Sequence, residues 1–595
     1  MPTPAPDPRF RMLEPVRHPL AHLPSLLVFA AVLGAADAVL ALTAWASPGL
    51  TALESLLALP WAWTVLRLEG LDRRRRALHL LHLVTIALLL ACLAAKWHVL
   101  LQPVPAEGIH AYRTYTVAAA LLAIVGLVGR GSRLGRLVLA IAEQPARLML
   151  LSFGGAALLG GFVLTLPVSL RSLGAASIVD GLFTATSAVC VTGLVVNDIA
   201  TTYTSFGQGV ILLLIQAGGL GIMVLSTFFV IVTGQRLRVR SSAVLAETID
   251  AESLASLRRA IVGIVLTTFA LEAAGAALLY LAFLRYPGIA LAAGAASPLS
   301  GAGGHLWASV FHAVSAFCNA GFSLFPSSLM PLVADPWVNL IVMGLILLGG
   351  IGFPVLDELR GRLRERARGE RPPRLSLHAR TALATSVALV FGLAAVLLSL
   401  EHAGAFGHLS WPEKLLAAVF KSVTTRTAGF NTVDTGALAP ASLFLICAVM
   451  FVGASPGSTG GGIKTTTLAT LVATLRAILR GESQARIFDR ALGEATTRRA
   501  IGVAFLSGVL VAFFAFLLLI AENGDPLGLA FEAMSAFATV GLSTGITGSL
   551  SVPGRLVLIL TMLIGRIGPL TLALALAGRG RAAAVGRPEE RLLIG

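Results

Sequence analysis

Charged residues are scarce in this chain. Asp, Glu, Lys and Arg make up 13% of its 595 residues, whereas about a quarter of the residues of a soluble globular domain are charged. Hydrophobic residues make up 56% of the chain, and the mean hydropathy is +0.85. Apolar runs of about 18 to 25 residues, long enough to cross a bilayer, recur along most of its length. The composition excludes an ordinary soluble protein and predicts a polytopic membrane protein.

Cysteine is also rare, and the whole chain has four: Cys92, Cys190, Cys318 and Cys447. Their wide spacing fits neither a disulfide framework nor a zinc site. The basic start of the chain leads into a full-length apolar span, without the short apolar stretch and cleavage site of a secretory signal peptide. We therefore expect a multi-pass protein of the cytoplasmic (inner) membrane that carries no cleaved signal.

Motifs for nucleotide chemistry are missing as well. The stretch GSTGGGIKT resembles a phosphate-binding P-loop, but Ile463 separates Gly462 from Lys464, and no β-strand is predicted before it. No dinucleotide-binding βαβ unit occurs elsewhere in the chain. The spans also lack the clustered Asp, Glu and His, or the metal ligands, of a membrane-embedded enzyme such as a lipid transferase. We expect a protein that is not an enzyme and does not itself hydrolyse ATP.

Acidic residues are outnumbered, with 30 Asp and Glu against 45 Lys and Arg, for a net charge of +15. The excess does not indicate nucleic-acid binding, because the basic residues cluster in short loops that alternate with uncharged ones. This positive-inside pattern reports orientation and contact with anionic lipid, and it predicts that both termini are cytoplasmic. The basic clusters are Arg73 to Arg76, Arg130 to Arg136, Arg236 to Arg240, Arg360 to Arg374, Arg476 to Arg499 and Arg579 to Arg591.

The predicted organisation is an accessory block followed by a repeat. Residues 1–147 contain about four transmembrane helices that begin and end in the cytoplasm. A unit of long span, half-length segment and long span then repeats four times. The predicted units are residues 148–234, 235–357, 358–475 and 476–580, and residues 581–595 form a cytoplasmic tail. The second spans are expected at Phe206–Gly234, Trp337–Leu356, Ala441–Leu475 and Arg555–Ala577.

The half-length segments are too short to cross a hydrocarbon core of about 30 Å. They lie on the side with few basic residues, so they are expected to enter from outside and return there. Non-helical backbone at membrane depth is tolerated only where it is buried in protein or lines a water-filled path. The fold class predicted is therefore an all-α polytopic membrane protein with four span–pore-loop–span units around one central ion pore. The half segments are Ile178–Gly193, His305–Gly321, Trp411–Gly429 and Pro526–Gly541.

Each half segment contains a Phe-x-x-x-[Ser/Thr] core and ends on a glycine five or six residues later. Glycine permits positive φ and close approach of backbones, which are needed for carbonyl oxygens to face a desolvated cation. Helix packing explains a single glycine equally well, but four at corresponding places favour an ion filter. The glycines are Gly193, Gly321, Gly429 and Gly541.

The third unit has a second glycine-rich stretch, GASPGSTGGG, inside its long second span. Pro456 and five glycines remove helix hydrogen bonds and helix propensity, so an intact helix is not expected there. Two structures fit this stretch: a proline kink, or an intramembrane loop.

Charged residues near these segments are further candidates. Arg566 lies within the last apolar span, where a charge marks a function or a buried partner, although snorkelling to the interface is the alternative. Lys464 is expected at a cytoplasmic helix end. Asp180 is expected to cap its pore helix. Three acidic residues are weaker candidates for drawing cations to the pore mouth: Asp198, Asp434 and Glu532.

Between about Ala146 and Gly580 the chain resembles the Trk/Ktr/HKT superfamily of potassium transporters, and among its subfamilies most of all the KtrB membrane subunits of bacterial Ktr systems. The N-terminal block has no counterpart in this pattern. The resemblance rests on the stretches DGLFTATSAVCVTGLVV (180–196), IQAGGLGIM (215–223), SAFCNAGFS (315–323), TTRTAGFNTVD (424–434), GASPGSTGGGIKTTT (453–467), SAFATVGLST (535–544) and GRIGPLT (565–571).

The resemblance implies which residues would form the site. K⁺ would bind at carbonyls of the filter, and glycine in all four units favours potassium over sodium. Arg566 would place a repulsive charge in the pore, beside an intramembrane gate loop. The implied filter residues are Val191, Thr192, Gly193, Asn319, Ala320, Gly321, Thr427, Ala428, Gly429, Thr539, Val540 and Gly541. The implied gate loop is Gly453, Ala454, Ser455, Pro456, Gly457, Ser458, Thr459, Gly460, Gly461 and Gly462.

The function implied is potassium uptake, coupled to Na⁺ and without a bound cofactor. The resemblance also implies a homodimer on a separate cytosolic ring of nucleotide-binding, KtrA-like regulatory subunits. The basic loops Arg360–Arg374 and Arg476–Arg499 are candidate docking surfaces for that ring, although a solvated cytoplasmic face explains them equally well. A less selective or Na⁺-preferring cation channel of the same architecture is the alternative function.

Overall fold

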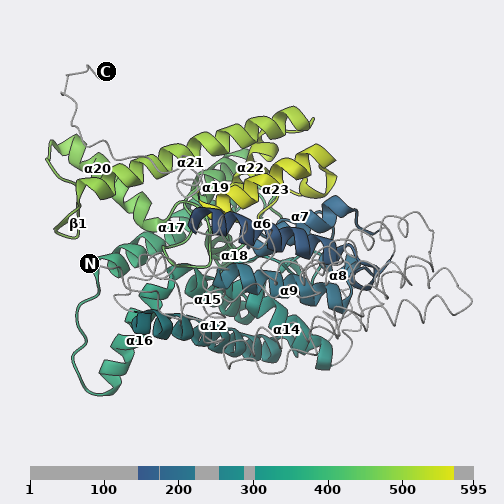
Figure 1. Cartoon of the computed structure of the whole chain (residues 1–595), viewed down its shortest axis with the longest axis horizontal. Helices are drawn as coiled ribbons and strands as arrows, with labels where there is room; N and C mark the ends of the chain where they lie inside the picture. Colours follow the sequence, from purple (N-terminus) through teal and green to yellow (C-terminus); the bar gives the residue numbers. More distant parts are fainter. Residues whose placement is uncertain (1–144, 173–174, 222–253, 287–301, 569–595) are drawn as a thin grey trace, which may run out of the picture. The chain divides into compact units, whose positions relative to one another are not determined.

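The structure is a computed structural model that describes residues 145–172, 175–221, 254–286 and 302–568 (Figure 1). Almost all of the predicted accessory block, the basic loop around residue 238 and the predicted tail 581–595 lie outside the described residues.

The described residues are predominantly helical, and three helices are long and apolar enough to cross a membrane. They are α12 (Leu254–Phe283), α17 (Leu377–Glu401) and α21 (Glu494–Ala521). The described strands, β1 (Arg486–Ile487) and β2 (Arg490–Ala491), pair in one short antiparallel hairpin. The prediction of an all-α, multi-pass membrane protein is confirmed, with this hairpin as a small addition.

Long and short helices alternate in the predicted order. The half-length segments form helices of 12 to 16 residues, which span only about 18 to 24 Å at 1.5 Å per residue. These pore helices are α7 (Ile178–Val189), α14 (Ala302–Phe317), α18 (Trp411–Thr424) and α22 (Pro526–Ala538). The first span of unit one is α6 (Pro145–Leu164), and the second spans are α9 (Ser205–Leu220), α15 (Pro336–Ile351), α19 (Pro440–Met450) and α23 (Val552–Ile567).

The remaining elements are connections: η3 (Pro167–Ser169), α8 (Ile199–Thr202), η4 (Met330–Leu332), α16 (Phe353–Ala367), α20 (Thr465–Arg480) and η5 (Thr547–Ser549). The basic segments of α16 and α20 and the β1–β2 hairpin lie at one end of the molecule (Figure 1). This is the end that the positive-inside pattern assigns to the cytoplasm.

Side chains cap the pore helices at their N-termini. Ser177 and Asp180 form a capping box on α7, in which the Ser177 N–H donates to the Asp180 carboxylate at 2.9 Å. Ser410 and Glu413 form the same box on α18, and Asp525 caps α22. Asp180 thus satisfies an N-terminal N–H group as predicted, although Ser177 is the cap residue itself.

The second spans are broken, which corrects the predicted boundaries. The span expected over Trp337–Leu356 ends at Ile351, and α16 continues at an angle of 106°. Helix α23 of the last span ends at Ile567, and the rest of the predicted span, to Ala577, lies outside the described residues. A glycine with positive φ follows each break, at 74° for Gly221, 97° for Gly352 and 87° for Gly568. Glycine adopts this conformation without steric cost, so it ends a helix readily.

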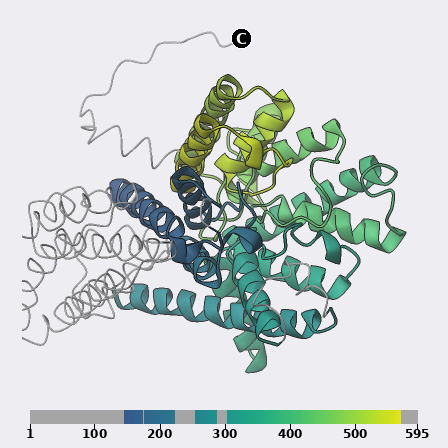
Figure 2. The same cartoon turned by 90° about the vertical axis from the view of Figure 1, so that its right-hand side faces the viewer.

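The four predicted units contact one another in a closed cycle. Each second span packs on the pore helix of the next unit: α9 on α14, α15 on α18, α19 on α22, and α23 on α7. The four largest apolar clusters in the described part of the chain lie at these four seams. Figure 2 shows the helices in this order around the middle of the molecule, from blue through teal and green to yellow.

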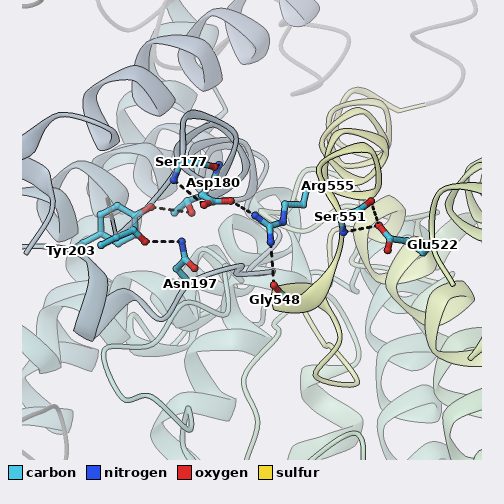
Figure 3. A network of polar contacts seen from close by, with 10 residues as sticks. Ser177, Asp180, Asn197, Tyr203, Glu522, Gly548, Ser551 and Arg555 are labelled. Atoms are coloured by element: carbon cyan, nitrogen blue, oxygen red, sulfur yellow. Dashed lines mark hydrogen bonds and ion pairs between the residues drawn. The ribbon is translucent and has the colours of Figure 1, made fainter. Parts of the chain in front are cut away.

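A polar contact fastens the seam between the last unit and the first. Arg555, at the start of α23, forms an ion pair with Asp180 of α7 and donates to the Gly548 carbonyl at 3.2 Å. On the same segment Ser551 donates to Glu522 at 2.6 Å (Figure 3). The two ion-pair side chains are 18% and 10% exposed, and the contact joins residues that lie 375 positions apart in sequence.

Candidate functional site

The segments that follow the four pore helices share one backbone conformation. We call residues 191–193, 319–321, 427–429 and 539–541 the filter segments. The first residue of each is left-handed, with φ of 57° at Val191, 60° at Asn319, 68° at Thr427 and 51° at Thr539. Positive φ is unusual for residues other than glycine, and most of all for β-branched ones. Such strain, repeated four times, is typical of a functional site.

The Ser or Thr of the recurrent motif holds each filter segment to its helix. The N–H of the middle filter residue donates to the carbonyl of this Ser or Thr, over 2.7 to 2.9 Å in all four units. The hydroxyl makes a second bond: Ser187 accepts from the Gly193 N–H at 3.0 Å and Ser535 from the Gly541 N–H at 3.1 Å. Ser315 and Thr424 instead donate to the carbonyls of Phe322 and Phe430, both at 2.8 Å.

The four filter segments meet one another through their glycines. A Cβ atom added to Gly321 would lie 2.6 Å from the Ala428 oxygen, and one added to Gly429 would lie 2.7 Å from the Val540 oxygen. Added to Gly193 it would collide with the Ala320 oxygen, and added to Gly541 with the Thr192 oxygen. Each glycine therefore lies against the middle carbonyl of the next unit, and the cycle closes. The structure brings all twelve predicted filter residues together.

This arrangement has a defined chemical capacity. The carbonyls of the middle residues lie against the filter glycines of neighbouring units, and the side chains of those residues are fully buried. Backbone carbonyl oxygens carry partial negative charge and are the groups that replace the hydration shell of a cation in ion filters. The four glycines also have φ between 70° and 97°, so both the backbone conformation and the lack of space require glycine.

The glycine-rich stretch of unit three is a loop, and the alternative of a proline-kinked helix is wrong. Helix α19 ends at Met450 and α20 begins at Thr465. Between them the chain folds back on itself, with Gly453 N donating to Ile463 O at 2.9 Å.

This loop lies directly against two filter segments. A Cβ atom at Gly460 would collide with the Thr427 hydroxyl, and one at Gly461 with the Thr539 hydroxyl. Both hydroxyls are buried and have no hydrogen-bond partner among the described residues. The loop thus touches the first residue of the filter segments in units three and four.

Unit two anchors the other side of the loop, at the point where its second span breaks. Ser455 N donates to Gly350 O at 3.0 Å, and Phe353 N donates to Gly457 O at 3.0 Å. The Thr459 hydroxyl donates to Phe317 O at 3.3 Å, at the end of pore helix α14. The loop is therefore held at the end of α15, where the second span of unit two breaks. This break was not predicted from the sequence.

Two basic side chains bind the carbonyls of the loop. Arg566 donates to Thr459 O at 2.5 Å and also to Gly218 O at the end of α9. Lys464, which precedes α20, donates to Gly460 O at 2.8 Å. Arg566 therefore does not snorkel to an interface, and Lys464 turns back from its helix start onto the loop. Both charges lie at the loop beside the filter segments.

Glycines of the second spans make room for the ends of the pore helices. This role was not predicted from the sequence. A Cβ atom at Gly218, Gly349 or Gly565 would collide with the last carbonyls of the pore helix in the same unit. These glycines stand three residues before the glycine that ends each span. The repeated Gly-x-x-Gly pattern was available in the sequence as a signal.

The three acidic candidates occupy different positions. Asp198 caps the short helix α8, accepting from Thr201 N at 2.8 Å, and Asp434 is exposed. Glu532, the third candidate for drawing cations to the pore mouth, is fully buried. Its carboxylate accepts hydrogen bonds from three groups in the segment beyond the filter: Ser543 Oγ at 2.5 Å, Thr547 Oγ1 at 2.9 Å and Thr544 N at 3.1 Å.

Glu532 belongs to a set of four residues, each directly after the Phe of the recurrent motif. We call this the brace position, and all four side chains there are buried. His312 bonds Ser323 at 3.0 Å, and Lys421 donates to Asn431 at 3.1 Å and to Thr435 at 2.5 Å. Thr184 accepts from the Tyr203 hydroxyl at 3.2 Å. Each brace ties a pore helix to the chain beyond its filter segment.

This assembly of broken spans, short helices and converging carbonyls defines a membrane transport protein rather than an enzyme. The family model TrkH, described as cation transport protein, matches residues 162–579, and the chain belongs to this family. It is 37% identical over 451 residues to "Ktr system potassium uptake protein B" of Vibrio alginolyticus, covering 76% of this chain and 94% of the relative.

Two further comparisons agree. "Potassium/sodium uptake protein NtpJ" of Enterococcus hirae is 34% identical over 459 residues, covering 76% of this chain and 97% of the relative. The crystal structure of the potassium transporter TrkH from Vibrio parahaemolyticus superposes with a TM-score of 0.59 at 18% identity, covering 84% of this chain and 97% of that one. The fold is therefore TrkH-like.

Proposed function

We propose that this protein takes up potassium across the cytoplasmic membrane, along a path between its four filter segments. The observation that carries the proposal is the closed cycle in which each filter glycine lies against the middle carbonyl of the next unit. A closed set of backbone carbonyls is suited to a dehydrated cation. The names of the relatives above, which specify potassium uptake, support K⁺ as that cation.

In this proposal the four predicted units surround one central pore, and K⁺ binds at carbonyls of the twelve filter residues. Residues 453–462 act as a gate loop, since the loop touches the first residues of two filter segments. Arg566 holds the loop through Thr459 and adds a positive charge that favours release of K⁺ from the filter.

The regulation proposed follows the resemblance to Ktr systems. The chain forms a homodimer with both termini in the cytoplasm, transport depends on Na⁺, and a KtrA-like ring of nucleotide-binding subunits controls the gate. The exposed basic residues of α16 and of the α20–α21 connection form the surface on which the ring docks. Two relatives bear the name of a Ktr system, which supports a partner subunit.

A less selective or Na⁺-preferring channel is the second candidate. The relative whose name specifies potassium and sodium uptake supports this candidate. Its identity and coverage are close to those of the relative named for potassium uptake alone.

Expression in a bacterium that lacks potassium uptake tests the proposal. We expect growth at low external potassium and uptake of radioactive rubidium that rises with external Na⁺, when a KtrA-like subunit is co-expressed. Competition with excess Na⁺ separates the two candidates, since a potassium-selective filter retains rubidium uptake. Membrane-inserted protein that supports neither growth nor rubidium uptake would contradict potassium uptake, and if it takes up no sodium either, both candidates are wrong.

A further inference from the structure

A carboxylate lies in the middle of a membrane span and takes no part in the filter. Glu272 of α12 is eleven residues from each end of the 23-residue apolar segment Ile261–Phe283, and it is 4% exposed. A charge at this depth is costly unless a partner neutralises it. Among the residues that the structure describes, no lysine or arginine pairs with Glu272. The charge therefore needs another counterpart.

The polar groups around Glu272 are also incomplete. One carboxylate oxygen accepts a weak bond from the Cys318 thiol at 3.6 Å, and the other makes no hydrogen bond within the part of the chain that the structure describes. Thr268 lies one turn earlier on the same face of α12, is 1% exposed, and has an unpaired hydroxyl. Gln216 of α9 lies close enough to the carboxylate to interact with it, but no bond of normal hydrogen-bond geometry forms, and its amide nitrogen has no such bond within the described residues. Two helices, α9 and α12, thus present unsatisfied polar atoms beside Cys318, which follows α14.

The chemistry of these groups indicates the ligand. Buried polar atoms without partners are rare and point to a missing water or ion. Carboxylate, hydroxyl and amide oxygens are hard ligands that prefer cations such as Na⁺. The amide oxygen and nitrogen of Gln216 exchange places by a simple rotation, which turns its oxygen toward the carboxylate. A single carboxylate balances one positive charge, whereas a divalent ion would need more.

We propose that Glu272, Thr268 and Gln216 form a binding site for one monovalent cation, with Na⁺ as its first candidate, outside the central path. The site lies behind the filter segment of unit two, because Cys318 directly precedes Asn319 and contacts Glu272. A Cβ atom at Gly219 would lie 2.5 Å from the Cys318 sulfur, so Cys318 is wedged between α9 and α12. A cation at Glu272 alters the contact that positions this filter segment. This effect on transport rests on the proposed function, but the binding itself does not.

Binding of radioactive sodium to the purified full-length chain tests the site, in saturating potassium so that the filter holds K⁺. We expect saturable sodium binding by the unmodified protein and at least about tenfold weaker binding by Glu272→Gln, which lacks the charge. The matched control is Glu401→Gln. Glu401 is 1% exposed on the first span of unit three, but both its oxygens accept N–H groups, from Ala439 at 2.9 Å and Ala405 at 3.2 Å. Equal sodium binding by Glu272→Gln and the unmodified chain would overturn the site.

A second pair of variants keeps the test decisive where Glu272→Gln does not fold. Thr268→Val removes a ligand oxygen at nearly constant volume, whereas Thr268→Ser retains it. We expect about threefold weaker sodium binding for the valine variant and little change for serine. Equal affinities for both variants would contradict the proposal. If the unmodified chain binds no sodium and Glu272→Gln changes only the pH dependence of rubidium uptake, the site takes a proton, and the cation proposal is wrong.

Reconstituted vesicles link the site to transport and separate the two hypotheses. We expect rubidium uptake to respond to Na⁺ in the unmodified and Glu401→Gln proteins, and to lose that response in Glu272→Gln while basal uptake persists. If no preparation takes up rubidium, the proposed function fails, whereas sodium binding still decides the site. If Glu272→Gln keeps the full Na⁺ response despite lost binding, the site does not act on the filter.

Discussion

The filter segments and the brace position belong to the same four stretches of chain, but they differ in how closely the units agree. The filter segments have one backbone throughout, with a left-handed first residue and a glycine third. The brace position has a different side chain in every unit, namely Thr184, His312, Lys421 and Glu532. All four are buried, and all bond the chain beyond the filter.

This contrast shows which features the site constrains. Four carbonyls that face one ion must have equivalent geometry, because a misplaced dipole loses its interaction with the cation. A brace only has to connect two backbones, so any buried polar group whose bonds are satisfied serves. The Ser or Thr of the recurrent motif shows a similar tolerance in unit three, where Thr424 lies five residues before its glycine instead of six, yet its hydroxyl still donates to Phe430 O at 2.8 Å. Substitutions should therefore be tolerated worst in the filter and in graded fashion at the braces.

The largest effect is expected from Gly429→Ser, which breaks the equivalence of the filter. Gly429 has φ of 80°, and a Cβ atom there would lie 2.7 Å from Val540 O. Strain of about 1–3 kcal/mol must displace a carbonyl, so we expect K⁺ discrimination against Na⁺ to fall by about tenfold or more. Inhibition of rubidium uptake by increasing Na⁺ measures this discrimination.

The control is Gly392→Ser, because Gly392 lies on the exposed face of α17 with no atom within 4 Å of an added Cβ. It should transport normally. Unchanged selectivity in Gly429→Ser would remove this glycine from the filter.

A large loss of stability is expected from Glu532→Leu at the brace of unit four. The change leaves Ser543, Thr544 and Thr547 without their shared acceptor in a buried place. Unsatisfied buried groups of this kind cost about 3–5 kcal/mol together. Glu532→Gln keeps an acceptor oxygen and should lose roughly half as much. Thermal unfolding of the purified chain measures both.

Glu494→Gln is the matched control for Glu532. Glu494 is exposed in a surface ion pair with Arg498, and such pairs contribute about 0–1 kcal/mol. A stable Glu532→Leu variant with an unchanged melting temperature would mean that the brace does not support its unit.

The same contrast explains what the sequence could predict. Converging backbones leave glycines and a regular Phe-x-x-x-[Ser/Thr] spacing, so the pore helices, the four filter glycines and the break in the helix at 453–462 were visible as a pattern. The other filter residues followed from the family resemblance. The breaks at Gly221, Gly352 and Gly568 were missed because apolar composition continues past them. Hydropathy identifies segments that face lipid, but it does not detect a change in the direction of the backbone.

The braces were missed for a different reason. Their side chains vary, so no residue type repeats, and Glu532 read as an attractor of cations because burial cannot be seen in a sequence. The sequence nevertheless has a polar residue directly after the Phe of each recurrent motif, and this repetition marks the brace position. Glu272 also left a signal, as an acidic residue at the centre of an apolar run.

A moderate effect is expected from Arg566→Gln. Arg566 stands at the position that Gly219 and Gly350 occupy in units one and two, so here too the backbone is equivalent while the side chain differs. The variant loses both guanidinium bonds, to Thr459 O and Gly218 O, and a positive charge. We expect the looser hold on the gate loop to outweigh the loss of the charge that favours K⁺ release, so that rubidium flux rises by about threefold, a change of less than 1 kcal/mol in the barrier.

Arg285→Gln is the control, because Arg285 is an exposed arginine at the end of α12. It should leave flux unchanged. An Arg566→Gln protein with normal flux would show that the charge does not control the gate loop.

The smallest effect is expected at the brace of unit one, where a single hydrogen bond of 3.2 Å joins Tyr203 to Thr184. Thr184→Val removes the acceptor and leaves the buried Tyr203 hydroxyl unpaired, so we expect a loss of about 1 kcal/mol in stability with selectivity retained. Tyr203→Phe removes the other partner. Because the two changes disrupt one bond, the double variant should lose about as much as either single variant. Thermal unfolding of the four proteins completes this cycle. Additive losses would mean that the two side chains act separately, and that unit one is held by packing alone whereas units two to four are held by polar braces.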